Sequence, residues 1–391
     1  MLSTLAVLNY RSLRDLVVPL ANLNVVTGAN GSGKTNLYRA LRLLADSALG
    51  LGSRSLVQEG GLVGARWAGP RSFTPEQRAG AAPIQGTGPS KDPVQLRLGF
   101  ASDPFGFAID FGLPRLEKPP SRFAFQPEIK REVIWAGAAY QAQRAVVDRH
   151  RAVVRVRQED GRRWETIRDD LAPSQSLFTE VADPRRAPEV LLLREQIRAW
   201  RFYDQFRTDR DAPARSASVA VRTQVLAHDG SDLAAAWQTI LDVGDGSGLT
   251  ASLRDAFPEA HVRIEGDEHH LSLAFEQRGL LRPLRQAELS DGTLRYLCWL
   301  AALWTPRPPP LIVMNEPENS LHPDLLLPLA RLIQQAATRS QLWVVTHDPT
   351  LRDALLETEG VRHLALTKRL GATEVEGLGL LTTPEWHWPR R

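Results

Sequence analysis

The stretch LNVVTGANGSGKT, residues 23–35, decides the fold. A short apolar run, residues 23–27, is followed directly by the pattern G-x-x-x-x-G-K-[ST] and then by residues 36–49, whose apolar positions have helical spacing. Backbone N–H groups of such a glycine-rich turn, and of the helix after it, point into one cavity that binds phosphate oxygens. The sequence therefore predicts a strand, a phosphate-binding loop and a helix, in that order.

Several positions of this loop have predicted chemical roles. Lys34 is expected to reach the β- and γ-phosphates of a nucleotide, and the Thr35 hydroxyl is expected to ligate Mg²⁺. Glycine is expected at positions 31 and 33 because a side chain there would block the approach of the phosphates. A plain glycine turn is the alternative, and the flanking strand and helix disfavour it. The predicted phosphate-binding residues are Gly28, Asn30, Gly31, Ser32, Gly33, Lys34 and Thr35.

Two further apolar runs end in polar side chains that suit this chemistry. LIVMNEP, residues 311–317, ends in Asn315 and Glu316, and LWVVTHD, residues 342–348, ends in His347. Nucleotide sites of open α/β sheets lie at the carboxyl edge of the strands, so these side chains are expected at that edge. Glu316 would orient or deprotonate the attacking water, and His347 would sense the γ-phosphate. The alternative for His347 is a capping or core histidine.

A fourth motif lies in ELSDGTLRYLCWLAALW, residues 288–304, where Ser290 and Gly292 precede a helix with an apolar face. A serine at such a place is ordinary helix capping when it stands alone. In the order P-loop, L-S-x-G, apolar strand with Glu-Pro, and Thr-His, however, the four motifs resemble the ABC-type ATPase heads of the RecF/SMC-like branch. The set is similar to predicted bacterial RecF-like AAA-family ATPases, and the match is specific over about residues 1–50 and 285–350.

This resemblance implies ATP and Mg²⁺ as cofactors and a homodimer of heads. In such heads two copies pair head to tail, and each supplies its L-S-x-G signature to the γ-phosphate of the other. Ser290, Asp291 and Gly292 would then act in trans, and residues 318–322 would take the D-loop position at the dimer seam.

Asn315 departs from the pattern of that branch, which normally has aspartate there as an outer ligand of Mg²⁺. Asparagine keeps a carbonyl oxygen but loses one negative charge near the metal. Thr35 and Asn315 are thus the predicted metal-binding residues. We expect the site to bind Mg²⁺ more weakly than a site with aspartate at position 315, and to retain ATP hydrolysis. The alternative is a degenerate site that binds ATP with little turnover.

The predicted fold class is α/β: a P-loop NTPase of the ABC-ATPase type with a mixed sheet and helices, plus an antiparallel β and helical insertion. Residues 1–55 and 285–391 are expected to form one head. The insertion, residues 56–284, would hold an antiparallel part at about 90–170 and a helical part at about 188–260. Finer expectations are loops from Gly50 to about Ala82, helices at 188–206, 232–244, 291–304 and 323–338, and strands near 261–265, 271–276, 311–315 and 341–346.

Composition adds limits rather than a function. The formal charge of +3 does not argue for nucleic acid, although Arg151, Arg155 and Arg157 are expected on one face of a strand as a candidate groove. Cys298 is the only cysteine, so no intrachain disulfide can form. No apolar run approaches a membrane span, no signal peptide pattern is present, and the cytoplasm is expected.

The work that the ATP does stays open at this stage. Three classes of function are considered. The first is a DNA clamp for repair, recombination or chromosome maintenance, the second is an ATPase subunit of anti-phage defence acting with a separate nuclease, and the third is a transporter subunit. The transporter subunit fits least, because the interval between Lys34 and Glu316 is much longer than in such subunits. Arg11 is a candidate for contacting adenine, and nothing in the spacing selects a Q-loop glutamine among Gln58, Gln95 and Gln141.

Overall fold

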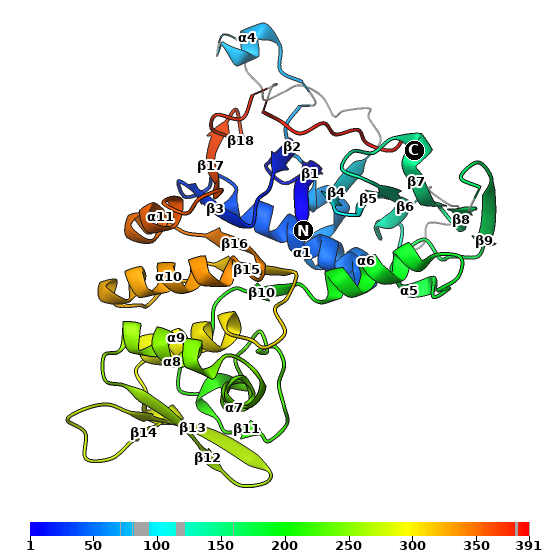
Figure 1. Ribbon diagram of the computed structural model, residues 1–391. Helices are drawn as coiled ribbons and strands as arrows, with labels where there is room; N and C mark the ends of the chain where they lie inside the picture. The colour runs from blue at the N-terminus through cyan, green and yellow to red at the C-terminus, as the bar shows by residue number, and fades with distance from the viewer. Residues whose placement is uncertain are drawn as a thin grey trace. The chain divides into compact units, whose positions relative to one another are not determined.

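The computed structural model describes residues 1–70, 72–79, 81, 94–114, 122–158, 160–379 and 382–390. The chain forms two compact units, each assembled from segments that are distant in the sequence (Figure 1). The first unit contains Met1–Leu20, Gly28–Arg198 and Leu364–Arg391, and the second contains Ala21–Thr27 and Ala199–His363. The division into an ATPase head and an insertion stays a prediction.

The first unit is built on an antiparallel sheet of eight strands in the order β2-β1-β4-β5-β6-β7-β8-β9. Its later strands lie where the sequence shows strand-like stretches between about residues 94 and 170. The bounds are β1 (Leu2–Tyr10), β2 (Leu13–Pro19), β4 (Gln95–Ser102), β5 (Phe105–Gly112), β6 (Glu128–Ala136), β7 (Ala145–His150), β8 (Val153–Arg157) and β9 (Trp164–Arg168).

Helix α1 (Lys34–Ala48) covers part of this sheet, because it contacts β1, β4 and α6 (Pro188–Arg198) (Figure 1). Its fully buried Leu37, Leu41 and Leu44 follow the spacing of one helix face. The first unit also contains the hairpin of β17 (Arg362–Arg369) and β18 (Ala372–Val375), and β18 contacts β2. The shorter helical segments are α2 (Gly52–Gln58), α3 (Gly61–Ala65), α4 (Pro75–Arg78), α5 (Leu177–Glu180) and the 3₁₀ turn Ala142–Arg144.

The second unit contains parallel strands in the order β10-β15-β16-β3. Their bounds are β10 (Arg201–Tyr203), β15 (Leu311–Asn315), β16 (Gln341–Val345) and β3 (Leu23–Gly28). Asn315 is paired with Val345, and Val345 is paired with Val26, so β15, β16 and β3 end at the same edge. This is the edge at which the sequence places the polar side chains of its motifs.

The core of the second unit lies around helix α9 (Asp291–Leu303), which packs against α7 (Leu233–Val243), α8 (Gly246–Ala256) and α10 (Leu326–Ala336). A small antiparallel sheet, with α7 against its strand β13, completes this unit (Figure 1). The remaining elements are β11 (Ser218–Val219), β12 (His261–Gly266), β13 (His270–Glu276), β14 (Leu284–Arg285), α11 (Pro349–Leu356) and the 3₁₀ turns Pro213–Arg215, Gln286–Glu288 and Pro323–Leu325.

Several element predictions are confirmed: α7 ends before Gly244, α9 begins after Ser290, and β12, β13, β15 and β16 occupy their predicted places. The helix predicted over 188–206 is wrong beyond Arg198, where the chain turns into β10. Tyr203 of β10 is buried there against Trp299, with ring centroids 6.0 Å apart. Pairing with β15 and this aromatic contact therefore override the helical pattern.

The loops predicted from Gly50 to about Ala82 are wrong in part, because α2, α3 and α4 occupy much of that stretch. Glycine lies at the boundaries of the first two helices, with Gly50 and Gly60 at φ 75° and 98°. Positions 71, 80 and 82 of that stretch lie outside the described residues. The helix predicted over 323–338 is shorter as well, since it opens with a 3₁₀ turn and α10 ends at Ala336.

Candidate functional site

The phosphate-binding loop predicted at residues 28–35 has the backbone of a tight glycine turn. Gly28, Gly31 and Gly33 have φ angles of 143°, 80° and 113°, which side-chain-bearing residues rarely adopt. An added Cβ at Gly33 would lie 2.1 Å from the Thr373 hydroxyl, whereas at Gly31 it would meet no described atom within 4 Å. Packing beneath the loop thus requires glycine at position 33, in addition to the predicted need for phosphate access.

The donors of this loop fit a phosphate. Lys34 is buried, and its Nζ donates to the carbonyl oxygens of Gly28 at 2.6 Å and Ala29 at 3.1 Å. Helix α1 begins after Gly33, and in the described structure no side chain caps its first N–H groups. Those groups carry the positive end of the helix dipole.

Two hydroxyls of the loop also suit a nucleotide. The Ser32 hydroxyl is buried without a hydrogen-bond partner among the residues that the structure describes. Thr35 is exposed, so that its hydroxyl is open to a ligand. The oxygens of a nucleotide phosphate would accept hydrogen bonds from the N–H, ammonium and hydroxyl groups of this loop. Bound Mg²⁺ would take a hydroxyl oxygen as a ligand.

A buried group of side chains that the sequence did not indicate supports the loop from below. The Thr373 hydroxyl donates to the Ser32 carbonyl at 2.7 Å and lies 2.7 Å from the Ser12 hydroxyl. Asn36 donates to the same Ser12 oxygen at 2.8 Å. The hairpin that contains Thr373 thereby fixes a peptide group of the phosphate loop.

Arg11, the candidate for contacting adenine, is bound to a carboxylate instead. Its Nε and Nη2 atoms donate to Glu59 at 3.2 and 2.9 Å, and the Tyr10 hydroxyl donates to the same carboxylate at 2.7 Å. Burial, reinforced by Glu59, raises the pKa of Tyr10 above its ordinary range. In this arrangement Arg11 has a structural partner, and its role toward adenine stays a prediction.

The second unit brings Glu316 and His347 together, as the ends of β15 and β16 predict. His347 Nε2 lies 3.0 Å from Glu316 Oε1, and both side chains are about one-third exposed. Glu316 has a φ of 51°, a left-handed conformation that costs about 1–2 kcal/mol for a residue with a Cβ. Its N–H still donates to Val345 O at 2.8 Å, so the chain turns sharply while the strand pairing continues.

Two residues that the sequence assigned only to the D-loop position hold this pair in place. Asn319 Nδ2 donates to Glu316 Oε2 at 2.8 Å, so each carboxylate oxygen of Glu316 has a close neighbour. Glu318 Oε1 accepts from the Thr346 hydroxyl at 2.7 Å and from the His347 N–H at 2.8 Å. Glu318 thus fixes the backbone on which His347 stands.

The signature, residues 289–292, lies at the start of α9. Ser290 is the N-cap of that helix, and its exposed hydroxyl accepts from the Thr293 N–H at 3.2 Å. A Cβ added at Gly292 would lie 2.9 Å from the Ser320 carbonyl oxygen, so glycine allows the D-loop to approach closely. The signature and the loop after Glu316 are therefore in direct contact.

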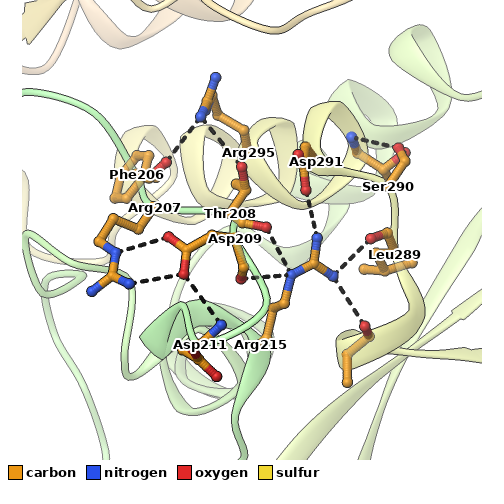
Figure 2. Close-up of polar contacts among 12 residues, drawn as sticks. Phe206, Arg207, Thr208, Asp209, Asp211, Arg215, Leu289, Ser290, Asp291 and Arg295 are labelled. Carbon is orange, nitrogen blue, oxygen red and sulfur yellow. Dashed lines mark hydrogen bonds and ion pairs between the residues drawn. The ribbon is translucent and has the colours of Figure 1, made fainter.

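Arg295 of α9 strengthens that contact. This buried side chain donates to the carbonyl of Asn319. It also donates to the carbonyl of Phe206 at 3.1 Å, a contact that Figure 2 shows. Burial lowers the pKa of its guanidinium. Because Asn319 also binds the Glu316 carboxylate, Arg295 connects the signature helix to the predicted catalytic carboxylate through one residue.

The structure places the predicted site residues in two groups. The loop from Gly28 to Thr35 belongs to the first unit, and Ser290, Asp291, Gly292, Asn315, Glu316 and His347 belong to the second. Sequence reasoning missed Ser12, Thr373 and Arg295, and it placed Glu318 and Asn319 only in the D-loop position. Glu318 and Asn319 lie close to Glu316 in the sequence, and that spacing is a signal of their role. The contacts of Ser12, Thr373 and Arg295 join distant positions and give no such signal.

The candidate arginine groove is only partly present. Arg155 and Arg157 share one face of β8, and both guanidinium groups lie over the Trp164 ring, 5.9 and 4.4 Å from its centroid. Arg151 instead lies in the turn before β8 with a φ of 56°. Arg157 also donates to the Ala145 carbonyl at 3.0 Å. These arginines therefore support the local fold, and the groove as predicted from three arginines is wrong.

Among the described helices, none has the length and the apolar character that crossing a bilayer requires.

Comparison with known proteins gives a family match and a fold match. The family described as "AAA domain, putative AbiEii toxin, Type IV TA system" matches residues 23–353, from β3 to beyond His347. No curated protein matches the sequence.

Among solved structures, the crystal structure of the SmcHead bound to the C-winged helix domain of ScpA is 13% identical, with a TM-score of 0.51 and coverage of 97% of this chain and 98% of that one. The SMC head domain from Thermotoga maritima is 12% identical, with a TM-score of 0.48 and coverage of 97% and 99%. At such identity the first likeness speaks for the fold alone. It confirms the predicted α/β P-loop fold of the ABC-ATPase type.

Proposed function

Since the chain belongs to the family described as "AAA domain, putative AbiEii toxin, Type IV TA system", we propose that it binds Mg-ATP and hydrolyses it in a homodimer of heads. The observation that carries the proposal is the carboxylate of Glu316, held between His347 Nε2 at 3.0 Å and Asn319 Nδ2 at 2.8 Å. A carboxylate fixed in this way can accept a hydrogen bond from an attacking water and orient it.

The phosphate loop supplies the binding half of the proposal. The first N–H groups of α1 and the Lys34 ammonium provide positive charge for the phosphates. Thr35 and Asn315 would hold Mg²⁺, which neutralises phosphate charge when it is bound. His347 would contact the γ-phosphate, and Ser290, Asp291 and Gly292 would act on the nucleotide of the second copy.

The proposed task of this ATPase is related to DNA: repair, recombination or chromosome maintenance. Its support is the fold shared with an SMC head. That solved head is bound to the winged-helix domain of another protein, which makes a protein partner a natural expectation here.

A second candidate task is favoured by the family description, which names a putative toxin of a Type IV TA system. In that case the chain would be the ATPase part of a defence system, acting with a separately encoded nuclease or another protein. Salt-sensitive binding to bare duplex DNA supports the first task, and co-purification with a nuclease supports the second.

The test of the proposed reaction is the steady-state rate of Mg-ATP hydrolysis per molecule as the protein concentration rises. We expect the rate per molecule to increase with concentration and to vanish in Glu316→Gln. Glu276→Gln is the matched control, since that glutamate lies on β13 of the small antiparallel sheet, is 36% exposed and pairs with Arg263 at 2.6 Å. A wild-type rate equal to that of Glu316→Gln at every concentration would contradict hydrolysis by this chain.

A further inference from the structure

Arg215 holds the signature through its guanidinium group. It ends the 3₁₀ turn Pro213–Arg215, and its Nη1 atom donates to the carbonyls of Leu289 at 2.8 Å and Ala287 at 3.0 Å. Its Nη2 atom donates to Asp291 Oδ1 at 2.6 Å (Figure 2). Ser290 therefore stands between two residues that the same guanidinium binds.

The same side chain is fixed to a second segment of the chain. Its Nε atom donates to the carbonyls of Thr208 at 2.8 Å and Asp209 at 3.1 Å, so one planar group spans five acceptors (Figure 2). The Arg215 side chain is only 12% exposed, whereas that of Asp291 is 61% exposed. A guanidinium that is largely shielded from solvent thus supports a signature that faces outward.

The segment to which Arg215 is bound is itself well anchored. Arg295 of α9 donates to the Phe206 carbonyl at 3.1 Å and to the Thr208 hydroxyl at 3.4 Å, which ties this segment to the signature helix (Figure 2). Buried Gln286 holds the turn of Arg215 itself, because it donates to the carbonyls of Ala214 at 2.5 Å and Ser216 at 2.8 Å. Arg215 therefore connects the signature to a fixed platform and not to a free loop.

We propose that Arg215 is a positioning residue for the signature: it fixes the backbone of residues 289–291 in the conformation in which Ser290 and Gly292 can meet the nucleotide of a second copy. This inference rests on the proposed function and assigns to Arg215 no contact with the nucleotide. Lysine cannot replace it, because an ammonium group has three donors at one point and lacks the planar fork that reaches both segments.

The first test measures the conformation without ATP. Amide hydrogen exchange of the full, nucleotide-free chain is compared between wild type and Arg215→Gln. We expect exchange of the amides within residues 289–294 to rise about tenfold, because several hydrogen bonds that hold this backbone are lost. Unchanged exchange of these amides would overturn the proposal.

Arg331→Gln is the matched control for that test. Arg331 also binds a carboxylate with two donors, to Asp255 at 2.8 Å each, but it lies on α10 and makes its hydrogen bonds to α8 instead of the signature. We expect no change at residues 289–294 in this control, and a change equal to that of Arg215→Gln would overturn the specific role of Arg215. Asp291→Asn is a milder variant that keeps the four carbonyl contacts, and a rise of about threefold is expected from the loss of one charged partner.

The second test measures dimer formation in a Glu316→Gln background, where hydrolysis is blocked. Sedimentation with Mg-ATP should show a dimer dissociation constant about tenfold higher when Arg215→Gln or Arg215→Lys is added, with ATP affinity of the monomer within about twofold. Dimers as tight as those of the parent would overturn the proposal for Arg215. If the Glu316→Gln parent itself stays monomeric with Mg-ATP, the proposed dimeric function fails, and the exchange experiment still decides whether Arg215 positions the signature.

Discussion

Asn319 donates a hydrogen bond of 2.8 Å to Oε2 of Glu316, while His347 lies 3.0 Å from the other oxygen of the same carboxylate. The two neighbours reach Glu316 from different elements, because Asn319 follows it in the same loop and His347 follows β16. Together they define the direction of the carboxylate. The loss of either neighbour should therefore affect a step that depends on this direction more than it affects nucleotide binding.

Asn319→Ala is expected to lower kcat for ATP hydrolysis about tenfold while KM stays nearly constant. The reason is that a hydrogen bond to a charged group is worth about 1.5–3 kcal/mol, and about 1.4 kcal/mol corresponds to a tenfold change in rate. Steady-state kinetics at saturating protein concentration measures both constants. Asn22→Ala, at an exposed position of the same unit, is the control. A rise in KM with unchanged kcat would show that Asn319 serves binding instead.

Asn315→Asp is expected to lower the Mg²⁺ concentration that gives half-maximal ATP hydrolysis. The substitution restores a full negative charge at the end of β15, and carboxylate oxygens bind Mg²⁺ better than amide oxygens do. A titration of Mg²⁺ at fixed ATP measures the effect. Asn22→Asp adds the same charge at an exposed position and should leave the midpoint unchanged. An equal midpoint in Asn315→Asp and wild type would refute the idea that Asn315 limits metal affinity.

Features that depend on contiguous residues could be predicted from the sequence. The strand, glycine turn and helix at residues 23–49 are local, and so are the polar ends of β15 and β16. Because parallel strands share an edge, those local patterns predict Glu316 and His347 at one edge of the sheet, and the pairing of β15 with β16 brings them into contact. The N-cap position of Ser290 is local in the same way.

Side chains that act across long separations could not be predicted. Arg215 binds Asp291, which is 76 positions away, and Ser12 binds Thr373, which is 361 positions away. No periodicity or motif spacing relates such positions, since their contact depends on how distant segments pack. The overlong helix at 188–206 has a related cause, because the turn into β10 depends on its pairing with β15.

Gly33→Ala is expected to disrupt the phosphate loop, whereas Gly31→Ala should be tolerated better. A Cβ at position 33 would lie 2.1 Å from the Thr373 hydroxyl, while position 31 has open space among the described residues. At Gly31 the cost is then mainly conformational, about 1–2 kcal/mol for a left-handed residue. Thermal unfolding measures the loss of stability in each variant, and ATP binding measures the damage to the phosphate loop.

The double variant Gly33→Ala/Thr373→Ala is the check on that cause. Removing the Thr373 hydroxyl relieves the nearest collision, so part of the stability lost in Gly33→Ala should return, as expected for residues in contact. If the double variant is no more stable than the sum of the two single losses predicts, the collision with Thr373 is not the cause.

Glu132→Gln is expected to destabilise the first unit by about 3–5 kcal/mol, the cost of leaving a buried charge without its partner. Glu132 and Arg149 are both fully buried and lie 2.7 Å apart, joining β6 to β7. The other carboxylate oxygen accepts from the Ser176 hydroxyl at 2.5 Å, so the start of α5 depends on the same group. Urea unfolding measures the loss.

Glu128→Gln is the control for that measurement. Glu128 lies on the same strand and pairs with Lys130, but its side chain is 23% exposed, and a partly exposed pair is worth about 0–1 kcal/mol. Both substitutions remove one negative charge from the same strand. A difference between their losses in unfolding free energy therefore reports the effect of burying the ion pair. Equal losses in Glu132→Gln and Glu128→Gln would mean that the Glu132–Arg149 pair contributes no more than a surface contact.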